Sequence, residues 1–262
     1  MNQPIYIVDA FTNKLFAGNP AAVCPLEKWP DDDVMQKIAM ENNLSETAFF
    51  VKEGNRYHIR WFTPTVEVPL CGHATLASSF IIFNFIEKET QEIRFDSKSG
   101  ELIITGEDDL ISLNFPANKP EKVKVTREVV GALKAEPKEL YLNKSYLAVF
   151  ETEEEIKSIK PDFREFENVH SDGIIITAPG NNSDFVSRYF VPSAGIDEDP
   201  VTGFAHTLLT PFWSERLNKK ELHAFQISKR GGELFLENLP DERVKISGKA
   251  TLYSQGSIFL DL

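Results

Sequence analysis

Three titratable side chains lie where an enzyme could use them as acids or bases. Glu46 lies between a predicted helix and the apolar strand 48–51. His73 follows Gly72 at the start of an apolar segment, and Asp199 ends an acidic run. A carboxyl group at the mouth of a strand is partly desolvated, which favours taking and returning a proton. The pattern predicts proton-transfer chemistry, with Glu46, His73 and Asp199 as candidate catalytic residues.

Each of these residues also has a purely structural interpretation. Glu46 could be a surface residue at the start of a strand, and His73 could hydrogen-bond backbone in the core. Asp199 could be a helix cap. An imidazole near a helix N-terminus tends to stay neutral, which suits donation of a hydrogen bond to a substrate. Both interpretations stay open for all three residues.

The sequence lacks the motifs of several other common enzyme classes. It contains no Gly-x-Ser-x-Gly elbow, no Walker loop and no dinucleotide fingerprint. Its five histidines include no i, i+4 pair, and its two cysteines, Cys24 and Cys71, are distant in sequence. A zinc site is therefore not expected. We expect chemistry without a metal or a cofactor.

The elements that must position these residues occur twice. Three pairs of short strings match at offsets of 128, 131 and 132 residues (188 − 60, 203 − 72 and 232 − 100). Small loop insertions explain offsets this similar better than chance does. The matching strings are residues 60–64 with 188–192, 72–74 with 203–205, and 99–102 with 231–234.

Each half also shows the same order of patterns. A strand leaves a hairpin, a glycine follows a polar loop, and then come an apolar helix and alternating strands. The helix is expected at 74–86 in the first half and from about Phe204 in the second, where Pro211 should kink it. An earlier helix near Pro30 has its expected counterpart at 128–135.

The repeat predicts an α+β fold with two pseudo-symmetric domains, residues 1–117 and 118–262. Each is expected to be a curved mixed or antiparallel sheet wrapped around one central helix. Duplicated domains pack around a pseudo-twofold axis, so the turns at Gly72 and Gly203 should face each other across an interdomain cleft. Helix N-termini attract anions, which predicts a small carboxylate as the ligand. The alternative is that both glycines only satisfy tight turns.

Composition limits the partners of the chain. Its 262 residues carry a formal charge of −12, from 28 Lys and Arg against 40 Asp and Glu, which disfavours nucleic acid and anionic membranes. The start reads as a strand and not as a signal peptide. The apolar run 76–86 is shorter than the roughly 20 residues that a bilayer requires. We expect a cytoplasmic protein.

Several ordered motifs resemble the phenazine-biosynthesis PhzF-like family, over nearly the whole chain. They are residues 9–12 with 16–23, 43–49, 60–64 leading to 70–75, 184–188, 197–203 and 228–234. The resemblance implies a homodimer of two pseudo-symmetric domains with the active site between them. It also implies a cofactor-independent isomerase, although some members have no determined activity.

The resemblance also assigns roles to residues. The best-described member shifts a proton within a dihydro-hydroxyanthranilate, and its acid/base is the glutamate that matches Glu46. The residues that match His73 and Asp199 assist. Asn19, Gly72, Gly203 and Phe204 are the predicted substrate-binding residues.

One position departs from the family. The family often has serine where this chain has Phe204, and a serine hydroxyl can contact substrate. Phenylalanine removes that donor and fills space, which puts the phenazine precursor itself in doubt as a substrate.

The fold expected also resembles that of diaminopimelate epimerase, which uses one cysteine at each of two opposed helix starts. Cys71 occupies one such place here, but its repeat partner is Thr202 (71 + 131 = 202). The two-thiol mechanism is therefore disfavoured, and Cys71 is more simply a small buried residue. An amino-acid epimerase or racemase with another acid/base pair, and a binding protein without turnover, remain the alternatives to the isomerase.

Overall fold

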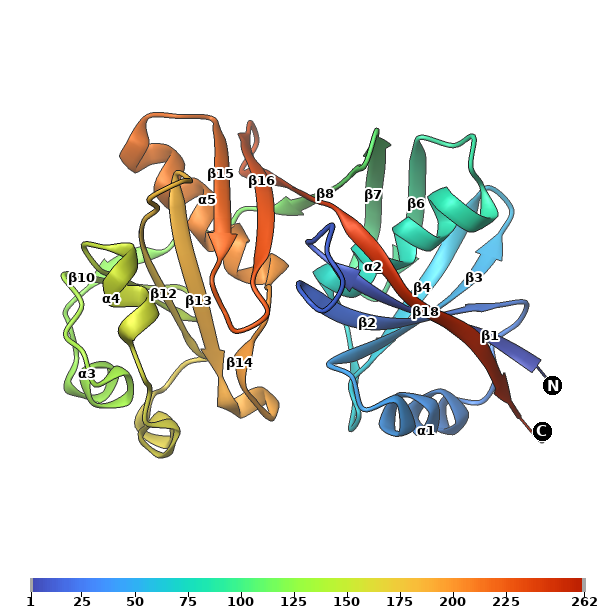
Figure 1. Ribbon diagram of the computed structural model, residues 1–262, viewed down its shortest axis with the longest axis horizontal. Helices are drawn as coiled ribbons and strands as arrows, with labels where there is room; N and C mark the ends of the chain where they lie inside the picture. Colours follow the sequence, from blue (N-terminus) through green and yellow to red (C-terminus); the bar gives the residue numbers. More distant parts are fainter. Residues whose placement is uncertain (1, 261–262) are drawn as a thin grey trace. The chain divides into compact units, whose positions relative to one another are not determined.

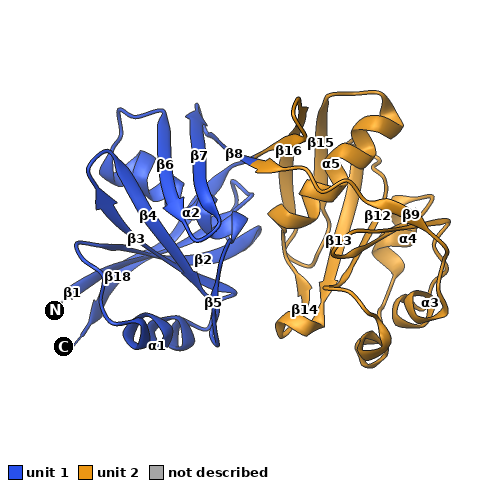
Figure 2. Ribbon diagram, turned by 180° about the vertical axis from the view of Figure 1, so that it is seen from behind, with its two compact units in different colours: residues 1–114, 247–262 blue, residues 115–246 orange. Residues whose placement is uncertain are grey.

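The structure is a computed structural model that describes residues 2–260. The chain divides into two units (Figure 2). Unit 1 consists of the described residues up to Asn114 together with those from Ser247 onward, and unit 2 is Phe115–Ile246. Unit 1 therefore contains both ends of the described chain.

The elements of unit 1 are nine strands, two α-helices and one π-helical turn. They are β1 (Asn2–Ala10), β2 (Asn19–Leu26), α1 (Asp32–Asn42), β3 (Glu46–Glu53), β4 (Arg56–Phe62), β5 (Glu67–Val68), α2 (Gly72–Ile81), the π-helical η1 (Ile82–Ile86), β6 (Glu92–Ser97), β7 (Gly100–Glu107), β8 (Leu110–Pro116), whose last two residues belong to unit 2, and β18 (Ala250–Phe259).

Unit 2 holds the elements from β9 to β17. They are β9 (Glu121–Val123), α3 (Arg127–Leu133), β10 (Glu139–Leu142), β11 (Tyr146–Val149), α4 (Glu153–Ser158), the 3₁₀ helix η2 (Phe163–Asn168), β12 (Ile174–Pro179), β13 (Phe185–Val191), the 3₁₀ helix η3 (Pro192–Ala194), β14 (Ile196–Asp199), α5 (Gly203–Leu217), β15 (Glu221–Gln226), β16 (Gly232–Leu239) and β17 (Arg243–Gly248), whose last two residues belong to unit 1.

The strand pairings confirm the internal duplication. In unit 1, β2 and β3 are parallel, β3–β4 and β4–β5 are antiparallel, β4 and β6 are parallel, and β6–β7 are antiparallel. In unit 2, the same sequence of pairings runs from β11–β12 through β13–β14 and β13–β15 to β15–β16. The α+β fold class with curved mixed sheets is therefore confirmed.

A pair of ion pairs repeats along with the strands. Arg60 of β4 holds Glu67 of β5 through Nε and Nη2, at 2.8 and 2.9 Å. Arg188 of β13 holds Glu198 of β14 through the same two atoms at the same distances. Both forked contacts tie the short strand that precedes the central helix to its neighbour. The sequence match between 60–64 and 188–192 thus reflects a shared structural device.

Each central helix is buried on most sides, as the apolar sequence predicts. Helix α2 packs against β1, β2 and β3, and α5 packs against β15 and β16 (Figure 1). The hydroxyl groups of α2 are satisfied locally, because Thr75, Ser78 and Ser79 donate to carbonyls one turn earlier. Burial of α2 therefore leaves these three hydroxyls paired.

Helix α5 continues through Pro211 to Leu217. A proline cannot donate to the carbonyl four residues before it. That carbonyl belongs to Thr207, and it accepts a hydrogen bond from the backbone N–H of Asn118 at 3.0 Å, while the Asn118 side chain donates to the Thr207 hydroxyl at 2.9 Å. The segment before α3 thus replaces the missing bond.

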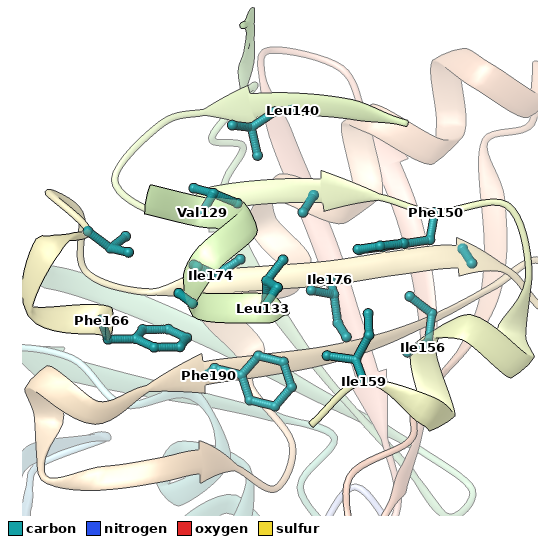
Figure 3. Packing of buried hydrophobic residues seen from close by; sticks show 14 of the residues in the cluster. Val129, Leu133, Leu140, Phe150, Ile156, Ile159, Phe166, Ile174, Ile176 and Phe190 are labelled. Atoms are coloured by element: carbon teal, nitrogen blue, oxygen red, sulfur yellow. The ribbon is translucent and has the colours of Figure 1, made fainter. Parts of the chain in front are cut away.

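Unit 2 also has a core away from α5. It lies between α3, α4, η2 and the strands β10 to β13, and Val129, Leu133, Ile156, Phe166 and Phe190 are among its members (Figure 3). Phe166 and Phe190 meet edge to face, with ring centroids 6.5 Å apart. The alternating and helical apolar positions of these elements therefore converge on one cluster.

Two details of the predicted organisation differ from the structure. The predicted boundary at residues 117 and 118 assigns the C-terminal strand to the second domain, whereas β18 pairs along β1 and lies in unit 1. The helix at 128–135 exists as α3, but its predicted equivalence to α1 is wrong. Helix α1 lies between parallel strands β2 and β3, and α4 with η2 holds that place between β11 and β12.

Across residues 2–260, no helix combines the length and the apolar character that crossing a bilayer requires.

Candidate active site

Three segments of unit 1 bring Glu46, His73 and Asn19 together. Asn19 and Glu46 are the first residues of the neighbouring parallel strands β2 and β3, in a register that pairs Ala21 with Glu46. Their side chains therefore start at the same edge of the sheet. His73 is the second residue of α2 and is 5% exposed. The start of the central helix is thus placed against the start of two strands.

The ring of His73 links the other two side chains. Its Nε2 lies 3.2 Å from Oε2 of Glu46, and its Nδ1 lies 3.2 Å from Nδ2 of Asn19. An amide nitrogen only donates, so Nδ1 accepts, and the neutral ring carries its proton on Nε2. Nε2 has no other close polar partner within residues 2–260, and its contact with Glu46 is not fully aligned as a hydrogen bond. The N–H and this carboxylate oxygen therefore lie buried beside each other.

Burial keeps this imidazole neutral. Burial disfavours the charged ring and lowers the pKa of His73 from 6.5 to about 3. At neutral pH the pair is therefore a neutral donor beside a carboxyl group. Such a pair can move a proton through Glu46 while His73 supplies a hydrogen bond.

This charge state gives a prediction that needs no substrate. We expect ¹⁵N NMR to show His73 neutral, with the proton on Nε2, at about pH 5, because its pKa is held near 3. Between pH 6.5 and about 3, His73 is protonated in the unfolded chain and neutral in the folded one. The free energy of unfolding should therefore fall as the pH is lowered through this range. A ring that titrates near 6.5 in the folded protein would contradict this assignment.

The thiol of Cys71 also lies against the ring. Its Sγ lies 3.5 Å from Nδ1 of His73, and one ligand atom each from Glu46, Cys71 and His73 falls within 4.8 Å of the others. The thiol faces Nδ1 and the carboxylate faces Nε2, so both nitrogens of the ring have a polar neighbour. Glu46, Cys71 and His73 therefore form a group of side chains that could also hold a metal ion, which the sequence did not predict.

The loop before β2, which places Asn19 beside His73, contains residues with positive φ. Gly18 has φ +67°, and a Cβ there would lie 2.1 Å from the carbonyl oxygen of Ala10. Phe16 also has a positive φ, and its backbone N–H donates to Oδ2 of Asp9 at 3.0 Å. The residue before Asn19 must therefore be glycine, because neither the dihedral angle nor the space admits a side chain.

Neither central helix has a side-chain cap at its N-terminus. Cys71 and Thr202 hold the N-cap positions of α2 and α5, and neither side chain accepts from the helix. Gly72 and Gly203 are the first helical residues, so neither adopts a left-handed turn conformation. The first N–H groups of a helix require outside partners and favour an anion.

Unit 2 places the other predicted residues around the start of α5. Asp199 ends β14, and its Oδ2 accepts from the hydroxyl of Thr202 at 2.6 Å. Phe204, the second residue of α5, lies against Tyr189 of β13, with ring centroids 6.5 Å apart. Burial, the largest cause, raises the pKa of Tyr189 to about 12, so its hydroxyl stays protonated.

The structure adds contacts to the predicted residues and two residues that were not predicted as part of the site, Thr202 and Gln226. Asn19, predicted to bind substrate, is 0% exposed and contacts His73. Thr202 and Gln226 form a buried network with Asp199. The signal for Gln226 was present, because the period of two in β15 places it on the inward face after Leu222 and Ala224.

Comparisons with known proteins place this arrangement in a family. The family model described as phenazine biosynthesis-like protein matches residues 8–256. An uncharacterized isomerase of Pseudomonas aeruginosa is 47% identical, over 99% of this chain and 100% of the relative. A crystal structure of a PhzF-family phenazine biosynthesis protein from Enterococcus faecalis has a TM-score of 0.97 at 47% identity, covering 99% of this chain and 100% of that one.

A more distant likeness concerns the fold alone. A hydroxyproline epimerase from Agrobacterium vitis superposes with a TM-score of 0.62 at 10% identity, covering 100% of this chain and 93% of that one. Curated relatives that are 44 to 47% identical over nearly the full chain are named isomerases, which places this enzyme among the isomerases. From the match over residues 8–256 and these relatives, the chain belongs to the phenazine biosynthesis-like (PhzC-PhzF) family of isomerases.

Proposed function

We propose that this isomerase moves a proton between two carbons of a small carboxylate, with Glu46 as the acid/base group and without a metal or a cofactor. The observation that carries the proposal is the 3.2 Å approach of Glu46 Oε2 to Nε2 of the buried, neutral His73. A carboxyl group that is 18% exposed beside a neutral donor is suited to take a proton and to return it.

The proposed reaction balances within the substrate. The Glu46 carboxylate removes a proton from one carbon, and the electrons of that C–H bond form a new double bond while those of the existing double bond move onto the conjugated carboxylate. His73 donates Nε2–H to the oxygen on which negative charge develops. Glu46 then returns the proton to a different carbon, and the original double bond has moved.

The start of α2 is the proposed site for the substrate carboxylate. Its first N–H groups have no side-chain cap, and the helix dipole favours negative charge there. His73 belongs to the same turn, so a carboxylate bound near Gly72 would lie close to the catalytic pair. We assign Asn19 the role of fixing the His73 tautomer, since its amide faces Nδ1.

Unit 2 is proposed to contribute in the way that the sequence predicts. Asp199 would assist as a second acid/base group, and the uncapped start of α5 at Gly203 would bind a further anionic group. Phe204 and Tyr189 would present aromatic surface to the substrate. That surface favours an apolar or ring-bearing skeleton over one that needs a serine-like hydroxyl contact.

Deuterium exchange tests this function directly. The purified protein is incubated in D₂O with the small-molecule fraction of a cell extract, and mass spectrometry and NMR identify carboxylates that gain deuterium at carbon. A shifted double bond in the labelled compound is the expected result. Exchange that inverts a stereocentre would support an epimerase, and absence of exchange from any carboxylate would contradict an enzyme of this kind.

An epimerase is the second candidate because of one contact. The Cys71 thiol lies 3.5 Å from Nδ1 of His73, where an imidazole could accept its proton. The position related by the repeat is Thr202, whose hydroxyl donates to Asp199. A thiol pair is therefore not available, and Glu46 remains the preferred acid/base group.

A further inference from the structure

The side chain of Gln226, the last residue of β15, makes all of its described hydrogen bonds to one short turn. It is 0% exposed. Its Nε2 donates to the carbonyl of Asp199 at 2.7 Å and to the Thr202 hydroxyl oxygen at 3.2 Å. Its Oε1 accepts from the backbone N–H of Thr202 at 2.9 Å. A buried amide thus spans the whole turn from Asp199 to Thr202.

The direction of this amide is fixed by its backbone partners. The N–H of Thr202 only donates, so it must meet Oε1, and the carbonyl of Asp199 only accepts, so it must meet Nε2. Nε2 therefore also faces the Thr202 hydroxyl as a donor. The hydroxyl accepts on that side, which leaves its own proton for Oδ2 of Asp199 at 2.6 Å.

Thr202 is used in an unusual way for its position. It holds the N-cap of α5, where threonine commonly accepts from the N–H groups of the first turn. Here the hydroxyl is directed backward to the carboxylate, and the helix start has no side-chain cap. The Thr202 side chain therefore does not cap the helix, and its hydroxyl is hydrogen-bonded to the Asp199 carboxylate instead.

Neighbouring side chains hold the rest of the turn. Ser228 donates to the carbonyl of Pro200 at 2.7 Å and accepts from the N–H of Gly231 at 3.1 Å. His206, buried and neutral with a pKa lowered by burial to about 4, has Nδ1 2.8 Å from the carbonyl of Thr202 and donates to it. The turn is therefore bound from α5 and from the segment that follows β15.

We propose that Thr202 and Gln226 are positioning residues that fix the Asp199 carboxylate in one orientation for the reaction. Gln226 orders the hydroxyl of Thr202, and Thr202 holds one oxygen of the carboxylate. Neither residue is proposed to touch substrate. The inference rests on the proposed function, which gives Asp199 its part in proton transfer.

Four variants separate this role from a general contribution to stability. Thr202→Val removes the hydroxyl with little change of shape, and Thr202→Ser restores it. Gln226→Glu keeps the shape but replaces the donor that faces the Asp199 carbonyl with an acceptor. Thr210→Val is the matched control, because Thr210 is a buried threonine of α5 whose hydroxyl donates to the carbonyl of His206.

The first readout is the conformation of Asp199 in crystal structures of these variants. We expect Thr202→Val and Gln226→Glu to show Asp199 in a new or divided rotamer, and Thr202→Ser and Thr210→Val to keep the orientation of the parent protein. An unchanged Asp199 in Thr202→Val would overturn the proposal. This readout requires no substrate. It therefore tests whether Thr202 and Gln226 orient Asp199 even if the proposed isomerase function is wrong.

The second readout is turnover in the deuterium-exchange assay. Thr202→Val should lower kcat by about 10- to 100-fold with a smaller change in KM, because misplacing a reacting group costs rate more than binding. Adding Thr202→Val to Asp199→Asn should lower kcat no further, since both changes remove the same interaction. Additive losses, or equal losses in Thr210→Val, would overturn the positioning role while the isomerase function stands.

Discussion

Replacing Glu46 with glutamine is expected to lower turnover by about two to four powers of ten while ligand binding survives. The amide keeps the shape and one acceptor oxygen beside His73 but cannot take a proton. The thermal midpoint should barely change. Deuterium exchange at the substrate carbon and a thermal melt of the same preparation measure the two effects.

Glu53→Gln is the matched control for this experiment. Glu53 ends the same strand that Glu46 begins, and it is exposed. It should exchange deuterium at the parental rate. If Glu46→Gln kept its activity and lost thermal stability, Glu46 would be a structural hydrogen-bonding residue, and the acid/base group would have to be Asp199 or His73.

Changing Asn19 to aspartate is expected to lower turnover by about 100-fold or more, through the protonation of His73. A carboxylate only accepts hydrogen bonds, so Nδ1 of His73 would have to carry a proton. The ring then either loses the proton from Nε2 or becomes an imidazolium. Both states replace the neutral Nε2–H beside Glu46 on which the proposed reaction depends.

¹⁵N NMR of His73 and deuterium exchange together check this prediction. Asn42→Asp is the control, because Asn42 is a half-buried residue of α1 whose amide donates to the hydroxyl of Thr47 in the same unit. It adds the same charge without facing the imidazole. Full activity in Asn19→Asp, with the proton still on Nε2 of a neutral ring, would exclude the proposed role of Asn19.

Much of the fold could be predicted because its signals are local and repeated. The alternation of Tyr57, Ile59 and Trp61 identifies a strand, and the repeated Arg60 and Arg188 strings mark equivalent places in both units. The strand with which β18 pairs could not be predicted in this way. Its pairing with β1 depends on contacts between opposite ends of the sequence, which carry no local pattern.

The repeat was misjudged in one place for a related reason. The apolar pattern at 128–135 is helical, and α3 forms there. Its equivalence to α1 could not be read from periodicity, because the place of a helix in a duplicated fold is set by the strands on either side of it. Helix α4 and η2, the true counterparts, are short and weakly patterned.

The candidate site was predictable as a set of residue types and not as a set of contacts. Glu46 and His73 could be singled out from their positions near strand and helix starts. Their 3.2 Å approach, and the link from Asn19 to the far side of the ring, depend on how β2, β3 and α2 meet. The sequence predicts a neutral His73 from its place at a helix N-terminus, whereas in the structure burial is what lowers its pKa.

The most direct test of the central claim is a crystal structure of Glu46→Gln with the carboxylate that exchanges deuterium in the parent protein. The account predicts that the exchanging carbon lies about 3 to 3.5 Å from the side chain of residue 46, at the distance of a near-attack arrangement. It also predicts that an oxygen of the ligand accepts from Nε2 of His73. A ligand whose exchanging carbon lies against another acid/base residue, with the side chain at 46 out of reach, would contradict the assignment of Glu46.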